Sequence, residues 1–391
     1  MEFWRVTTGL VVLLGAHGCL SPPAADEHAA APVASSASPS GAAAPQSAAS
    51  TDVAPGAEGQ TEDGDMPRPR RARHEAAVRQ NADCVRCHPT AAASWRRSRH
   101  AQSYTNPAFT RGHAAEPHTF CSDCHAPELD PTKASDPAVT ALGIGCVTCH
   151  VTDDGTILAA PLATPRKPDA AALGQGEPHS VRRSVAFGGL GACAGCHEFR
   201  FPGRYGDEAE CFMQTTVREH LASPTAKVPC AQCHMPAADD RRSHAFDETR
   251  NPEWLRSKLT AAAARHGDQA RITLAQTSPG HGFPTGDLFR RLEVGIAVVD
   301  EAGKTVHRER RYLARHFVAE PGWNGRRLIR DDRVFDEPVT LQFTVPPADS
   351  AIARVEWRVT YQRVLTPGRG REPESATIES EIPLHTGELT W

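Results

Sequence analysis

Cys84-Val85-Arg86-Cys87-His88 is one of five C-x-x-C-H pentapeptides in this sequence. The other four copies run from Cys121 to His125, from Cys146 to His150, from Cys193 to His197 and from Cys230 to His234. Two cysteines three positions apart lie on one side of a helical turn, and the next residue is close to both of them. Each copy therefore presents two thiols and one imidazole to a single bound group.

The group that best fits this set of side chains is a covalently attached haem c. The two thiols bond to the vinyl groups of one porphyrin, and the histidine reaches its iron. Pairs of C-x-x-C also bind zinc, but zinc does not require His after every pair. Because His accounts for only 19 of the 391 residues, its presence after all five pairs is not expected by chance and argues against zinc. A disulfide or thioredoxin-like interpretation leaves the five histidines unexplained. The motifs thus predict five haem c groups.

The motifs supply ten covalent attachment sites and five proximal iron ligands. The attachment sites are Cys84, Cys87, Cys121, Cys124, Cys146, Cys149, Cys193, Cys196, Cys230 and Cys233. The proximal ligands are His88, His125, His150, His197 and His234.

Composition favours a protein whose interior is made largely of cofactor. Only 39% of the residues are hydrophobic, and the chain has 32 prolines and 30 glycines. Five porphyrins would supply the apolar surface that the side chains lack, so we expect the haem segment to be unfolded without haem. The net charge is −4, and the sequence has no stripe of Lys and Arg suited to a phosphate backbone, which argues against nucleic acid as a partner.

The N-terminal residues 1–19 have the pattern of an export signal. The apolar run from Leu10 to Leu14 is too short to span a membrane and fits the apolar centre of a signal peptide. Cys19 follows this run and resembles the lipidated cysteine of bacterial lipoproteins. The resemblance implies lipidation of Cys19, with simple signal cleavage as the alternative.

Residues 20–73 are rich in Ala, Pro and Ser and contain almost no aliphatic side chains as far as residue 65. Such a segment cannot bury enough apolar surface to fold, so we expect a disordered tether. Together with Cys19, it predicts an exported bacterial protein that is periplasmic or lies on the outer membrane or cell surface. A lipid anchor would be its link to the membrane.

The haem segment, residues 74–267, resembles the multihaem cytochromes related to the tetrahaem cytochrome of hydroxylamine oxidation. The resemblance rests on the first motif, on Trp95, and on the sequence Ser98-Arg99-His100-Ala101. In that family the histidine of Ser-x-His-Ala is a distal haem ligand, which implies the same role for His100. The resemblance indicates a mostly helical or irregular domain around haem but does not specify an activity.

Histidine is abundant enough to complete the iron sites, whereas Met213 alone is a suitable axial thioether. Most haems should therefore be bis-histidine, six-coordinate and low-spin. The distal candidates are His100, His118, His179, His244 and His281, with His113 and His220 in reserve. His88 and His100 would lie roughly 18 Å apart along a helix, so each haem should be attached by one segment and capped by another.

Residues 268–391 show a different pattern, in which apolar and polar side chains alternate. Leu292, Val294, Ile296 and Val298 form one such run. Alternation between turns predicts antiparallel strands, and we expect a small β-sandwich of the immunoglobulin-like sort. The predicted fold class is α+β. The loop 280–286, which contains His281, resembles a loop in the C-terminal parts of multihaem cytochromes.

These features predict an electron-transfer protein rather than an enzyme. Its partners would be a redox donor and a redox acceptor protein. One alternative is an oxidoreductase that acts on nitrogen or sulfur oxyanions or on hydroxylamine at an open haem. Pentahaem nitrite reductases typically have a C-x-x-C-K motif, whereas all five motifs here end in His. Another alternative is a scaffold cytochrome that uses the sandwich for assembly.

We predict that Cys19→Ser releases the protein from the membrane fraction, because the acyl chains that anchor it would have no sulfur to attach to. Fractionation of cells followed by immunoblotting measures this release. Ser21→Ala is the control and should leave the protein in the membrane fraction. If Cys19→Ser and the parent partition equally into the membrane fraction, Cys19 does not carry a lipid anchor.

Overall fold

The computed structural model describes residues 70–161, 179–204, 208–238, 241–247, 251–319, 326–347, 351–366 and 375–391. The expected signal peptide, Cys19 and nearly all of the tether lie outside the described residues. Within the described residues, no helix has both the length and the apolar character that crossing a membrane requires.

The first part of the chain folds into short helices joined by turns. The helices are α1 (Glu75–Cys87), α2 (Pro89–Arg97), α3 (Pro107–Ala115), α4 (Cys121–His125), α5 (Pro137–Leu142), α6 (Cys146–His150), α7 (Ala192–His197), α8 (Thr216–Leu221), α9 (Cys230–His234) and α10 (Pro252–Lys258). Single turns of π- and 3₁₀-helix occupy Phe187–Gly191 and Ala209–Cys211. Proline at the first position of α3, α5 and α10 follows an Asn or Asp whose side chain accepts a helix N–H, so local sequence starts these helices.

Three small pairs of strands lie among these helices. They are β1 (Ile157–Ala159) with β2 (Val181–Arg183), β3 (Glu198–Arg200) with β4 (Phe212–Thr215), and β5 (Ala237–Ala238) with β6 (Arg241–Arg242). The apolar clusters here are small, and one consists of Ala77, Leu142, Val147 and Val151. The side chains alone thus give the helical part little core, as its composition indicated.

The second part is built of antiparallel sheets. Its strands are β7 (Leu259–His266), β8 (Gln269–Gln276), β9 (Arg290–Asp300), β10 (Thr305–Leu313), β11 (Arg315–Ala319), β12 (Arg326–Asp331), β13 (Val339–Thr344), β14 (Ile352–Thr366) and β15 (Thr377–Thr390). One sheet has the order β10-β9-β14-β15 and another the order β13-β8-β7, while β11 pairs with β12. The predicted α+β class is confirmed.

The core of the second part lies between its two larger sheets. Ile272 and Leu274 of β8 belong to the same buried cluster as Val294 of β9 and Val359 of β14. The predicted alternation of buried side chains accounts for this packing, since successive residues of a strand point to opposite faces. β7 begins at Leu259, ahead of the boundary expected at residue 268. Its inward positions include Ala261 and Ala263, which are too small to give a strong sequence pattern.

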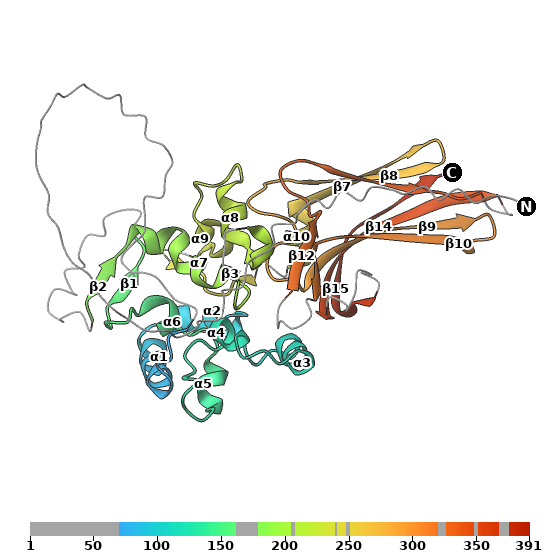
Figure 1. Cartoon of the computed structure of the whole chain (residues 1–391). Helices are drawn as coiled ribbons and strands as arrows, with labels where there is room; N and C mark the ends of the chain where they lie inside the picture. Colours follow the sequence, from blue (N-terminus) through green and yellow to red (C-terminus); the bar gives the residue numbers. More distant parts are fainter. Residues whose placement is uncertain are drawn as a thin grey trace, which may run out of the picture.

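The two parts lie end to end (Figure 1), with α10 leading directly into β7. The loop between β8 and β9 is at the end of the sandwich that contacts the helical part, because Gly282 donates a hydrogen bond to Glu219 of α8. The sandwich is therefore placed to contribute residues to sites in the helical part.

Candidate functional site

All five C-x-x-C-H motifs lie on helical turns. In α4, α6 and α9 the helix begins at the first cysteine and ends at the histidine, while α7 ends at its motif histidine and α1 ends at Cys87. All ten motif cysteines are free thiols. Each turn therefore holds two thiols and an imidazole together, as the motif spacing predicts.

The motif turns also lie against one another. A hydrogen bond between thiols connects Cys193 of α7 with Cys230 of α9. A second one connects Cys196 of α7 with Cys124 of α4, and together with burial it raises the pKa of Cys196. The turn at α7 is thus in contact with two other motifs.

Four motif histidines each face a second histidine from a distant segment. The pairs are His88 with His179, His100 with His197, His150 with His244, and His234 with His281, and their ring centroids are 6.1, 6.2, 6.2 and 6.0 Å apart. In each pair, the histidine that faces the motif histidine is one of the five predicted distal candidates, and four of the five are placed in this way. His88 and His100 belong to different pairs, as their separation in the sequence predicted.

The spacing within each pair fits one metal ion between the two rings. An imidazole nitrogen lies about 2.0 Å from a transition metal, so two rings on opposite sides of one ion have centroids roughly 6 Å apart. The residues present therefore fit an iron held by two histidines.

Hydrogen bonds orient the rings in these pairs. The Nδ1 atom of His150 lies 2.8 Å from the carbonyl oxygen of Leu158, and that of His244 lies 3.0 Å from that of Arg242. The Nδ1 atom of His281 lies 3.1 Å from the carbonyl oxygen of Gly282. A ring that donates from Nδ1 keeps Nε2 unprotonated, which is the form that binds a metal.

Burial favours the same neutral form. Desolvation, the largest cause, and nearby histidines together lower the pKa of His100, His197 and His234 to about 4. A neutral imidazole needs to lose no proton before it coordinates iron. The protein therefore holds these rings ready for a metal.

His125 has a different environment from the other motif histidines. Its Nδ1 atom lies 2.9 Å from the carbonyl oxygen of Ser103. Phe109 stacks on its ring at 4.2 Å, and within the described residues no histidine ring faces it at the spacing of the four pairs. Phe109 also stacks on the reserve candidate His113, at 5.4 Å.

Charged side chains from the sandwich lie near His125. Asp287 is 3.6 Å from Arg290 and 3.8 Å from Arg363. Although burial favours the neutral acid, these two arginines lower the pKa of Asp287 to about 2. Burial is the largest influence on the pKa of His125 and lowers it. Arg363 also lowers this pKa, whereas Asp287 raises it.

Three other candidates do not join a pair of this kind. His118 stacks on Phe120 at 5.4 Å, so the structure does not bring it together with a motif histidine. Both ring nitrogens of His220 lie 2.9 Å from backbone carbonyl oxygens, those of Gly280 and Val228, which leaves neither nitrogen for a metal. Met213 packs beside the cluster formed by Phe201, Leu288 and Phe317.

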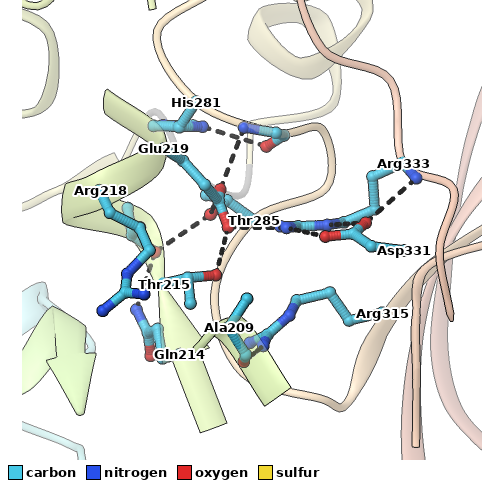
Figure 2. A network of polar contacts seen from close by, with 12 residues as sticks. Ala209, Gln214, Thr215, Arg218, Glu219, His281, Thr285, Arg315, Asp331 and Arg333 are labelled. Carbon is cyan, nitrogen blue, oxygen red and sulfur yellow. Dashed lines mark hydrogen bonds and ion pairs between the residues drawn. The ribbon is translucent and has the colours of Figure 1, made fainter. Parts of the chain in front are cut away.

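A buried carboxylate holds the loop that carries His281 (Figure 2). Glu219 of α8 accepts hydrogen bonds from Gly282 N at 3.1 Å and from Thr285 Oγ1 at 2.8 Å. It also accepts one from Thr215 Oγ1 at 2.6 Å and pairs with Arg333 at 2.7 Å. Although burial favours the neutral acid, Arg333 and these hydrogen bonds lower the pKa of Glu219 to about 2. The carboxylate thus ties His281 to the helical part.

Arg315 makes a second connection between the two parts. Its guanidinium donates to the carbonyl oxygens of Ala209, Phe212 and Met213 at 2.8, 2.9 and 2.9 Å. Figure 2 shows Arg315 beside Ala209. Neither Glu219 nor Arg315 was identified from the sequence. Both look there like ordinary charged residues, and nothing in their spacing indicates that folding buries them.

The chain is similar to known multihaem cytochromes in part of its sequence and in its fold. Residues 83–151 match the family described as cytochrome c554 and c-prime. The fold is similar to that of a penta-heme cytochrome c552 from Thermochromatium tepidum, with a TM-score of 0.59, 19% identity and coverage of 81% of this chain and 100% of that one. A glycosyl hydrolase family 2 member from Bacteroides cellulosilyticus, at 10% identity, covers 34% of this chain and 14% of that one with a TM-score of 0.16, which is too low to support any argument. The curated proteins gave no match.

We predict that Glu219→Gln lowers the free energy of unfolding by about 2 kcal/mol, because it removes one of the two carboxylates that pair with the buried guanidinium of Arg333, the other being Asp331. Urea unfolding followed by circular dichroism measures the change. The control is Glu356→Gln, which removes the partially exposed pair with Arg354 and should cost less than about 1 kcal/mol. Equal, small losses in both variants would show that Glu219 does not hold the loop.

Proposed function

We propose, from its similarity to multihaem c-type cytochromes, that the chain binds five haem c groups and transfers single electrons along them. The observation that carries this proposal is the set of four histidine pairs at 6.0–6.2 Å. Bound haem supplies an iron that alternates between the ferric and ferrous states. An iron with a histidine on each side has no position free for a substrate, which suits electron transfer.

The chain's own residues would hold the haems in a fixed, close arrangement. The ten motif cysteines would attach them covalently, and the motif histidines would bind the irons from one side. His100, His179, His244 and His281 would cap four irons from the other side. Contacts between motif thiols, such as Cys193 with Cys230, support a close packing of the haems.

We place this activity outside the cytoplasm, in respiratory or extracellular electron transport. The signal-like residues 1–19 and the Ala/Pro/Ser-rich residues 20–73 support export and a tether. A lipid on Cys19 would anchor the protein to the periplasmic or outer membrane surface. Its partners would be a donor and an acceptor redox protein.

We predict that His281→Ala converts one haem from low-spin to high-spin, because His234 would remain as the only histidine on that iron. Electron paramagnetic resonance and absorption spectra measure the change. The mass of the denatured variant should still show five attached haems, since the thioether bonds do not depend on the distal ligand. His266→Ala, in an exposed strand end, is the matched control and should leave the spectra unchanged.

Two results would count against this assignment. Spectra of His281→Ala that match the parent would show that His281 is not an iron ligand. A denatured mass with fewer than five haems in a host that matures c-type cytochromes would contradict the haem count.

A second function, reduction or oxidation of a small nitrogen or sulfur compound, is favoured by the surroundings of His125. Within the described residues Phe109, not a second histidine, is its ring neighbour. Asp287, Arg290 and Arg363 place charged groups near this site, and the arginines would suit an anionic substrate. An open iron here would bind ligands that the other four irons exclude.

If this second function holds, we predict that the oxidised parent protein binds about one equivalent of cyanide, at the haem attached through Cys121 and Cys124, because the other irons have two histidines. Optical titration measures the stoichiometry. His281→Ala serves as calibration, since it opens a second iron and should raise the stoichiometry to about two. A parent that binds no cyanide, while His281→Ala binds one equivalent, would exclude the enzymatic function and leave electron transfer.

A further inference from the structure

His74, Glu75 and Asp136 form a cluster away from the motif turns. His74 precedes α1, Glu75 is its first residue, and Asp136 precedes α5. One potential ligand atom from each side chain lies within 4.8 Å of the other two. The cluster therefore joins the N-terminal ends of two helices that pack together.

His74 makes this cluster more than a group of surface acids. It is only 4% exposed, and neither of its ring nitrogens has a hydrogen-bond partner. Its backbone N–H donates to the carbonyl oxygen of Glu128 at 2.7 Å, which fixes its position. A buried imidazole without any partner is costly unless another group satisfies it.

We propose that His74, Glu75 and Asp136 bind one divalent transition-metal ion, separate from the haem irons. One imidazole nitrogen and two carboxylate oxygens are ligands of the kind that Zn²⁺ and Mn²⁺ accept. Ca²⁺ and Mg²⁺ prefer sets made of oxygen alone, so the histidine favours a transition metal. The two carboxylates balance the charge of the ion.

An open hollow of about 230 Å³ lies beside the cluster. Glu75 and Asp136 line it together with Val78, Arg79 and Ala138, whereas His74 is not part of its lining. Asp136 uses Oδ1 to cap Ala138 N at 2.8 Å, which leaves Oδ2 for a metal. Glu75 is exposed and only 3.8 Å from Arg79 in a weak surface pair, so it is free to turn toward the ion. Water would complete the coordination.

The site is distinct from the haem attached to the same helix. Ten residues of helix place His74 about 15 Å from Cys84. An ion here would instead link the start of α1 to the start of α5, beside the small cluster of Ala77, Leu142 and Val147. It would stabilise a part of the protein that has little apolar core of its own.

The test uses the full-length holoprotein after treatment with a chelator. Isothermal titration with Zn²⁺ and with Mn²⁺, together with elemental analysis, should show one bound ion per chain in addition to the haem irons. His74→Ala and Asp136→Asn should each weaken Zn²⁺ binding by about 100-fold or more, since loss of even an outer-shell partner costs 10–100-fold. His266→Ala, an exposed histidine of the sandwich, is the control and should bind as the parent does.

The haem spectrum separates this proposal from a role of His74 at a haem. His74→Ala should weaken Zn²⁺ binding and leave the absorption and paramagnetic resonance spectra unchanged. If His74→Ala binds Zn²⁺ as the parent does, or if the parent binds neither ion, the site does not exist. If the variant instead shows a new high-spin haem, His74 is an iron ligand and the proposal is wrong.

Discussion

The pairing of histidines from distant segments is the constraint on which the helical part depends. Each pair holds two imidazoles with ring centroids 6.0–6.2 Å apart, a spacing suited to one iron between them. The short helices bring only small apolar clusters of their own. Their arrangement therefore makes physical sense around bound haem, which would join the segment that attaches it to the segment that caps it.

The sandwich takes part in this arrangement and does not stand as an independent module. Its β8–β9 loop carries His281, and Glu219 holds that loop through Gly282, Thr285 and Arg333. Asp287, which lies in the same loop, is near His125 together with Arg290 and Arg363. One end of the sandwich thus caps one candidate iron site and sets the charge near another.

The sequence predicted much of the site because its chemistry is local. A C-x-x-C-H turn contains the two thiols and the proximal imidazole within five residues, and the strands of the sandwich follow from alternation along one strand. His100, His179, His244 and His281 were named from the sequence and do lie opposite motif histidines. His118 was named on the same grounds and instead lies beside Phe120, because nothing in the sequence says which segments cross.

The sequence by itself determined the order of a helical part followed by a β part, and its motifs predict the cofactor type and the attachment residues. Only the tertiary structure decided which histidines face each other, that Phe109 lies against His125, and that Glu219 and His74 are buried. These features depend on contacts between residues far apart in the chain. Periodicity and motif spacing describe neighbours in sequence, so they carry no information about such contacts.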